Sequence, residues 1–148
     1  METFVVQTLE ELAVVCEQVL SGLRTSASEG ATVLALRGDL GAGKTAFVKI
    51  LGQLLGITEQ MVSPTFVVMK SYETTDEQFA TLIHMDAYRI EHETDLVPLH
   101  FDTVLATPQT LVCIEWAELI SGALPTTYTD LLFVEVDGVR TLTLTHHG

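Results

Sequence analysis

The chain has 148 residues, of which 47% are hydrophobic, and a formal net charge of −13. This length suits one domain with its own core, and the apolar content excludes a disordered chain. An acidic surface repels phosphate, which argues against extensive direct binding of RNA or DNA. Any involvement with nucleic acid is therefore expected to run through a partner protein. Acidity that serves only solubility or salt adaptation is an equal alternative.

The sequence carries no sign of a membrane segment or of a disulfide framework. No apolar run approaches the length of a membrane span, and Met1-Glu2-Thr3 begins no signal peptide, so we expect a cytoplasmic protein. Cys16 and Cys113 lie in apolar surroundings without metal-binding spacing. This pattern predicts two reduced thiols in the core.

The first half of the chain predicts a strand, a helix and then a second strand and helix. Residues 4–8 are typical of a short strand, and residues 9–23 of a helix in which Thr8 is the N-cap and Glu11 follows three residues later. After a polar loop, residues 31–36 form an apolar, β-branched run that predicts a buried strand.

The rest of the chain predicts one more helix and mainly strands. Apolar residues at helical spacing over 46–55 end at Gly56, and the loop 61–65 follows. The remaining strands are predicted over 66–72, 80–85, 110–116, 131–136 and 139–145, the first two as a hairpin and the last two as a hairpin around Asp137-Gly138. Residues 96–105 are ambiguous, with a short helix interrupted at Pro98 as one interpretation. These elements predict an α/β fold: a mixed sheet with a parallel centre and antiparallel edge hairpins, with helices packed on it.

The segment Gly38-Asp39-Leu40-Gly41-Ala42-Gly43-Lys44-Thr45 fits the phosphate-binding loop G-x-x-x-x-G-K-[ST]. It lies between a predicted strand and a predicted helix, where backbone N–H groups and the helix dipole attract an anion. Lys44 can then reach the β- and γ-phosphates, and the Thr45 hydroxyl can bind Mg²⁺. A chance match occurs about once in several hundred chains of this length. The loop therefore predicts nucleotide binding.

Phosphoryl transfer also needs an acid near Mg²⁺ and a group that orients the attacking oxygen. Asp86 and Glu115 each end an apolar strand, and the carboxyl ends of parallel strands meet at one edge of a sheet. Exposed carboxylates at strand ends are the alternative, but a functional role is favoured. Thr65, held by the preceding proline, is a weaker candidate for a hydroxyl that senses the γ-phosphate or its Mg²⁺.

Four further residues adjoin these acids. Trp116, the only tryptophan, follows Glu115, and both core packing and a place beside the nucleotide stay open for it. His84, Tyr88 and Arg89 flank Asp86, and we interpret them as structural. Two motifs typical of other phosphate-loop enzymes are absent from the sequence. The chain has no Asn-Lys-x-Asp motif, with which Ras-like GTPases recognise guanine, and no arginine-rich lid segment, which small-molecule kinases usually have. A Ras-like GTPase and a small-molecule kinase are therefore both disfavoured.

Four motifs in order resemble one family, and the resemblance spans residues 8–140. They are the loop at 38–45, Ser63-Pro64-Thr65-Phe66, His84-Met85-Asp86-Ala87-Tyr88-Arg89 and Ile114-Glu115-Trp116. As a set they are similar to TsaE (YjeE), the bacterial ATPase of tRNA threonylcarbamoyladenosine biosynthesis. The resemblance implies a single P-loop ATPase domain over residues 1–148 that binds ATP and Mg²⁺.

The resemblance also implies how the protein works. It would hydrolyse ATP slowly and support the TsaD and TsaB proteins, which attach threonylcarbamoyl to adenosine 37 of tRNAs that read ANN codons. Hydrolysis would reset that complex, tRNA would be met only through the partners, and the protein alone would be a monomer or weakly self-associated. A small-molecule kinase and a nucleotide-dependent interaction module without required hydrolysis are the alternatives.

Residue roles follow from the same resemblance. Lys44 would contact phosphate, Thr45 and Glu115 would hold Mg²⁺, and Asp86 would orient the hydrolytic water. Thr65 would act as a switch-like hydroxyl. The nucleotide would be bound by Thr8, Asp39, Leu40, Gly41, Ala42, Gly43, Lys44, Thr45, Trp116 and Arg140. The chain departs from the common family pattern at Ala46, Met85 and Ala117, none of which carries this chemistry.

Overall fold

The computed structural model describes residues 1–26, 29–39, 42–62 and 68–148. The strands are β1 (Glu2–Val6), β2 (Thr32–Gly38), β3 (Met69–Glu73), β4 (Thr81–Asp86), β5 (Thr110–Glu115), β6 (Tyr128–Val136) and β7 (Val139–His147). The α-helices are α1 (Leu9–Thr25), α2 (Lys44–Leu54) and α3 (Phe101–Ala106), and the 3₁₀ helices are η1 (Ala87–Arg89), η2 (Glu93–Leu99) and η3 (Ala117–Ala123). Within the described ranges, no helix is both long and apolar enough to cross a membrane.

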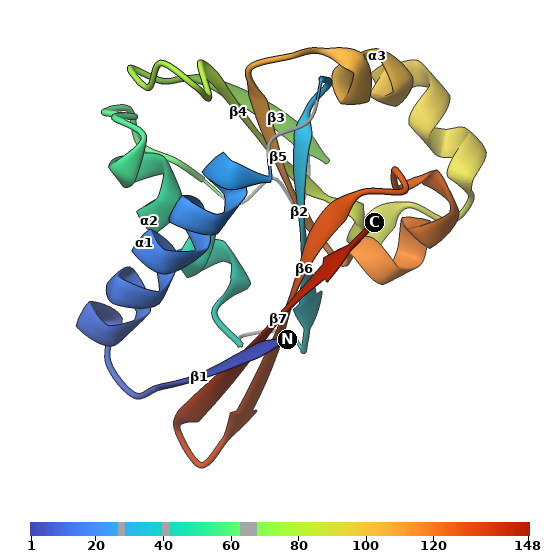
Figure 1. Cartoon of the computed structure of the whole chain (residues 1–148). Coiled ribbons are helices and arrows are strands. Elements are labelled where there is room, and N and C mark those ends of the chain that lie inside the picture. Colours follow the sequence, from blue (N-terminus) through green and yellow to red (C-terminus); the bar gives the residue numbers. More distant parts are fainter. Residues whose placement is uncertain (27–28, 40–41, 63–67) are drawn as a thin grey trace.

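All seven strands form one sheet in the order β1-β7-β6-β2-β5-β4-β3 (Figure 1). The four central strands β6, β2, β5 and β4 are parallel. The pairs β1–β7, β7–β6 and β3–β4 are antiparallel. The predicted mixed sheet, with its parallel centre and its two hairpins, is confirmed.

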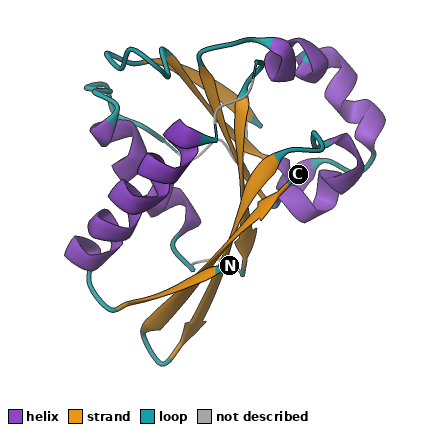
Figure 2. Ribbon diagram, viewed as in Figure 1, coloured by secondary structure: helices purple, strands orange, loops and turns teal. Residues whose placement is uncertain are grey.

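Helices cover both faces of the sheet (Figure 2). On one face, α1 and α2 pack on side chains such as Leu34, Leu36 and Leu111. On the other face, η2, α3 and η3 pack on side chains such as Val33, Val112 and Ile114. Strands β2 and β5 are thus buried on both sides, which explains why their sequences are almost continuously apolar.

The N-terminal elements differ from the prediction only at their ends. The Thr8 hydroxyl caps α1 by accepting a hydrogen bond of 3.1 Å from the backbone N–H of Glu11. Because Thr8 serves as the cap, β1 ends at Val6 rather than at residue 8. Helix α2 begins at Lys44, two residues before the predicted start, so its first turn lies within the phosphate-loop motif.

Other differences occur where a residue with a left-handed backbone conformation interrupts the predicted element. The ambiguous residues 96–105 fall in η2, which contains Pro98, and in α3; the two helices are separated by His100 in a left-handed conformation (φ +54°). Strand β5 ends at Glu115 because Trp116 is also left-handed (φ +58°). The loop predicted at 61–65 lies partly outside the described residues, as do the first two residues of the strand predicted at 66–72.

The prediction of two reduced core thiols is confirmed. Cys16 and Cys113 are free and buried. Burial raises the pKa of Cys16 to about 12, with a further contribution from the charge of Glu17. Burial also raises the pKa of Cys113 well above its ordinary value. Both side chains are therefore uncharged thiols at neutral pH.

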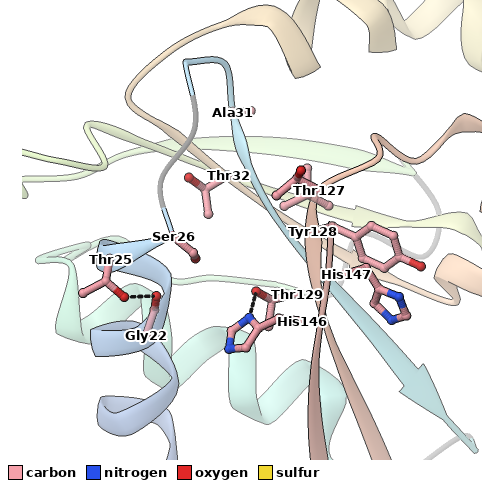
Figure 3. Close-up of a pocket in the computed structure, with 11 residues that line it drawn as sticks. Gly22, Thr25, Ser26, Ala31, Thr32, Thr127, Tyr128, Thr129, His146 and His147 are labelled. Carbon is pink, nitrogen blue, oxygen red and sulfur yellow. Dashed lines mark hydrogen bonds between the residues drawn. The ribbon is translucent and has the colours of Figure 1, made fainter. Parts of the chain in front are cut away.

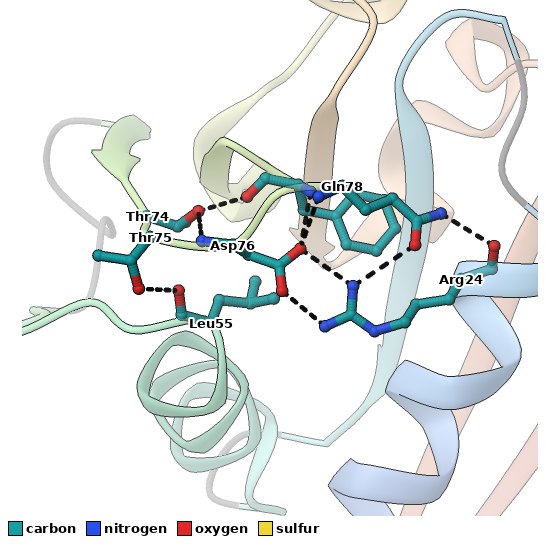
Figure 4. Close-up of polar contacts among 7 residues, drawn as sticks. Arg24, Leu55, Thr74, Thr75, Asp76 and Gln78 are labelled. Atoms are coloured by element: carbon teal, nitrogen blue, oxygen red, sulfur yellow. Dashed lines mark hydrogen bonds and ion pairs between the residues drawn. The ribbon is translucent and has the colours of Figure 1, made fainter.

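An ion pair fixes the end of α1 to the turn between β3 and β4 (Figure 4). Arg24 donates two hydrogen bonds, of 3.0 and 2.7 Å, to the two carboxylate oxygens of Asp76. The same carboxylate accepts backbone N–H groups of Gln78 and Phe79 at 3.0 and 2.9 Å. The hydrogen bond from Arg24, followed by these other donors, lowers the pKa of Asp76 to about 2.

We expect Asp76→Asn to lower the free energy of unfolding by about 2 kcal/mol at pH 7. This is the stabilisation that corresponds to the difference between the ordinary pKa of an aspartate and the lowered pKa of Asp76. The folded-state pKa lies below the unfolded-state value, so this stabilisation is present above pH ~4 and lost as the pH falls towards ~2. Urea unfolding at several pH values measures it. Glu17→Gln, the same charge change at an exposed position of α1, is the control. If the difference in free energy of unfolding between the wild type and Asp76→Asn is the same at pH 7 and at pH 3, the lowered pKa does not stabilise the fold.

Candidate functional site

The described residues of the glycine loop lie at the end of β2 and at the start of α2. Gly38 has φ +139°, and a Cβ added there would lie 2.4 Å from the Phe133 carbonyl oxygen, so a larger residue does not fit. Gly43 is the N-cap of α2 with φ +106°. Leu40 and Gly41, predicted to bind nucleotide, lie outside the described residues. The loop therefore delivers the next two residues, Lys44 and Thr45, into the first turn of a helix.

Thr45 contacts a carboxylate from the middle of the sheet. Its hydroxyl oxygen lies 3.0 and 2.9 Å from the two carboxylate oxygens of Glu115, the last residue of β5. Glu115 is only 4% exposed. Because β2 and β5 pair in parallel, with Leu36 beside Glu115, the acid lies at the strand end next to the loop. Two residues that are 70 positions apart in the sequence are thus in hydrogen-bonding contact.

A second acid lies beside Glu115. Strand β4 pairs in parallel with β5, and Asp86 is the direct partner of Glu115 in this register. Asp86 is 5% exposed, and its Oδ1 accepts a hydrogen bond of 2.9 Å from the backbone N–H of Tyr88. The structure therefore brings together both strand-end acids that the sequence singled out. They are not the solvent-exposed carboxylates of the alternative interpretation.

His84 belongs to the same cluster, although the sequence suggested only a structural role for it. Its Nε2 lies 2.5 Å from Oε2 of Glu115, and the ring is fully buried. Side chains two residues apart on a strand point to the same face, so His84 lies on the face of Asp86. Its two-residue spacing from Asp86 and its place in the motif at 84–89 were the signals in the sequence that could have indicated this position.

Lys44 is buried, and it contacts both the loop and Trp116. Its Nζ donates a hydrogen bond of 2.6 Å to the Gly38 carbonyl and lies 3.8 Å from the centre of the Trp116 ring. Burial lowers the pKa of Lys44, and the nearby negative charges, led by that of Glu115, oppose this shift. The Trp116 ring also packs against Tyr88, with 5.2 Å between ring centres. Trp116 is therefore a half-buried residue at the edge of the loop.

The remaining predicted residues occupy different places. Arg140 pairs with Val6 in the sheet and lies next to the loop, since a Cβ added to Gly43 would be 3.5 Å from its guanidinium carbon. Thr8 caps α1 just beyond β1, and its hydroxyl also lies 3.3 Å from a carboxylate oxygen of Glu11. Asp39 is exposed. Thr65, with the rest of the motif at 63–66, lies outside the described residues.

The oxygen atoms at this site suit Mg²⁺ better than a metal ion whose ligands all come from the protein. In the described part of the chain, no group of three or more His, Cys, Asp or Glu side chains could hold a metal ion. Mg²⁺ commonly uses one or two protein oxygens and completes its shell with water and phosphate oxygens. The Thr45 hydroxyl and the Glu115 carboxylate, which are in contact with each other, could supply these protein oxygens.

A separate cavity of about 270 Å³ lies near the beginning of β2, away from the strand ends that carry these acids (Figure 3). Hydroxyl groups of Thr25, Ser26 and Thr32 line it, together with His146, whose Nδ1 lies 3.0 Å from the Thr129 hydroxyl. None of the described residues that line it carries a carboxylate side chain. This cavity therefore lacks the groups that phosphoryl transfer needs.

Comparisons with known proteins identify the family. The family model described as threonylcarbamoyl adenosine biosynthesis protein TsaE matches residues 6–142. The tRNA threonylcarbamoyladenosine biosynthesis protein TsaE of Bacillus subtilis is 39% identical over 108 residues, which is 73% of this chain and 65% of that protein. The protein of the same name from a Nostoc species is 38% identical over 109 residues, 72% of this chain and 64% of the relative. The matches thus span just under two thirds of these two relatives.

The fold agrees with a solved structure. The crystal structure of YdiB from Bacillus subtilis superposes with a TM-score of 0.75 at 29% sequence identity, covering 99% of this chain and 86% of that one. The family match covers strands β2 to β6 in full, together with the loop motif and both acids. The chain therefore belongs to the TsaE family of tRNA threonylcarbamoyladenosine biosynthesis proteins.

Proposed function

We propose that this chain is a slow, partner-activated ATPase that supports the threonylcarbamoyl transfer complex acting on adenosine 37 of tRNAs that read ANN codons. The contact between Thr45 and Glu115 is the observation that carries the proposal. A hydroxyl in the first turn after a phosphate loop, set against a strand-end carboxylate, is the pair with which P-loop enzymes hold Mg²⁺. Membership of the TsaE family supports the proposal that this ATP hydrolysis serves tRNA modification.

Each residue of the site has a role in this proposal. Thr45 and Glu115 would hold the magnesium ion, which supplies positive charge to the phosphate oxygens when it is bound. Lys44 would exchange the neutral Gly38 carbonyl for a phosphate oxygen, because a hydrogen bond between two charged groups is the stronger one. The backbone N–H groups of the loop from Asp39 to Thr45 would bind the same phosphates.

Asp86 is proposed to orient the attacking water, since its buried carboxylate lies directly beside Glu115. Thr65 is proposed as the hydroxyl that responds to the γ-phosphate. Trp116 and Arg140, which both lie against the loop, would contact the nucleotide, with Thr8 beyond them towards the adenine. We further propose that residues 1–148 act as a single domain, because both core clusters pack on one sheet.

The proposed partners are the TsaD and TsaB proteins, and the proposed place of action is the cytoplasm. A chain with 20 acidic and seven basic residues is unsuited to bind tRNA directly, which favours contact through these proteins. Alone, the protein would be a monomer or weakly self-associated.

The function is tested by measuring phosphate release from ATP with the chain alone and with a TsaD–TsaB pair. We expect slow release alone and a clear stimulation by the pair, because partners that complete a site raise its turnover. The absence of both binding and stimulation would reject the proposal. Transfer of labelled phosphate to a small acceptor instead of water would support the kinase alternative.

Replacement of Glu115 by Gln should lower ATP turnover about 100-fold or more, since a positioned metal contributes several kcal/mol to stabilising the transition state. ATP should still bind, because the loop amides and Lys44 remain. Equilibrium binding and phosphate release separate the two effects. Glu91→Gln, at an exposed position, is the control. If the variant keeps full threonylcarbamoyl modification over many turnovers, hydrolysis is dispensable and the interaction-module alternative holds.

Trp116 provides an optical signal for nucleotide binding. It is the only tryptophan, and the Lys44 ammonium lies 3.8 Å from its ring centre. If Lys44 moves to a phosphate, the fluorescence of Trp116 should change when ATP and Mg²⁺ are added. In Lys44→Met the change should be lost or much reduced at the same ATP concentration. An unchanged spectrum despite binding shown by calorimetry would place Trp116 outside the nucleotide site.

A further inference from the structure

We propose that His84 is a positioning residue that holds the Glu115 carboxylate in the orientation required for magnesium. The inference rests on the proposed function, because it concerns the acid that would bind the metal. His84 would act through its hydrogen bond to Glu115 and would not contact the nucleotide itself.

The sheet register brings the two side chains together. His84 pairs with Cys113 and Asp86 pairs with Glu115 across the parallel strands β4 and β5. His84 and Glu115 therefore lie two register positions apart on neighbouring strands and on the same face of the sheet. From there the imidazole reaches Oε2 of Glu115 at 2.5 Å.

The direction of this hydrogen bond is part of the proposal, because an imidazole nitrogen donates or accepts according to the tautomer. An ionised carboxylate only accepts hydrogen bonds, so the proton of this contact belongs to Nε2 of His84. Glu115 then has donors on two sides, the His84 ring from β4 and the Thr45 hydroxyl from α2. Two donors from different elements fix both the position and the rotation of the carboxylate plane.

A merely structural role explains this histidine poorly. The ring is fully buried, and Nδ1 has no hydrogen-bond partner among the described residues. A buried polar atom without a partner costs free energy, and an apolar side chain at this position would avoid that cost. The neighbouring Cys113 thiol is uncharged, because burial raises its pKa. The hydrogen bond between Nε2 and Glu115 is thus the interaction that accounts for a histidine at this position.

Partners of this kind tune metal sites. A group that hydrogen-bonds to a metal-binding carboxylate limits its rotation, and its loss typically lowers metal affinity 10- to 100-fold. Without His84, the Glu115 carboxylate would keep only the Thr45 contact of the two found here. Magnesium-dependent binding of ATP should then suffer, whereas binding through Lys44 and the loop amides should not.

Two substitutions of similar polarity separate the roles of the two ring nitrogens. In His84→Gln, the side-chain amide nitrogen is as many bonds from Cα as Nε2, so it can still donate to Glu115. In His84→Asn, the amide nitrogen corresponds in position to Nδ1 and falls short of the carboxylate. Both variants lose the ring, so a purely packing role predicts the same effect from each.

The measurement is calorimetric binding of ATP in EDTA and in excess Mg²⁺. The ratio of the two affinities gives the coupling between metal and nucleotide. We expect His84→Asn to lower this ratio 10- to 100-fold while leaving the metal-free affinity within about 3-fold of wild type. His84→Gln should keep the ratio within about 3-fold of wild type. In a Glu115→Gln background, His84→Asn should have little further effect on the ratio, since the two residues act as one unit.

Equal losses in the Asn and Gln variants, or a loss confined to the metal-free affinity, would overturn the inference. If the Asn variant fails to fold, ¹⁵N-histidine spectra of the wild type decide instead. The His84 signals, assigned by their absence in His84→Gln, should show a protonated Nε2 and should shift more with Mg²⁺ and ATP than with ATP alone. Signals that do not respond to the metal would reject the inference. A wild-type chain that does not bind ATP at all would instead reject the proposed function.

Discussion

The buried carboxylate of Glu115 is the constraint on which the rest of the site depends. A carboxylate that is 4% exposed is stable only where donors surround it, and these donors come from elements far apart in the chain. Strand β5 lies between β2 and β4 in the sheet, and all three run parallel. Their ends therefore meet, so that α2 supplies Thr45 from one side and β4 supplies His84 from the other.

If the protein binds ATP as proposed, charges close to the loop rather than the net charge of the whole chain would attract the phosphates. The chain carries a net charge of −13, which repels phosphate at long range. Two of its seven basic residues, Lys44 and Arg140, lie at the loop. Burial disfavours the charged form of Lys44, while Glu115 and the other nearby acids support it. The acids that surround the loop thus help to keep its lysine charged before any ligand arrives.

The sequence predicted the fold well where burial is uniform and less well where backbone conformation changes sharply. Strands β2 and β5 are buried on both faces and were recognisable as apolar runs. The segment from η2 to α3 was ambiguous because a proline interrupts the pattern and His100 adopts a left-handed conformation. The end of β5 similarly depends on the backbone of Trp116, which its neighbours in the sequence do not specify.

By itself, the sequence determined the phosphate-loop motif, the identity of the two strand-end acids and the family. These features are short patterns of residue types, so they can be recognised without knowing which distant parts of the chain they contact. Only the tertiary structure decided that Asp86 and Glu115 are adjacent, that Thr45 touches Glu115, and that His84 contacts the same carboxylate. Strand order and register set these contacts, and both arise from the packing of the whole sheet. The contact of His84 with Glu115, 31 positions away in the sequence, was therefore visible only in the tertiary structure.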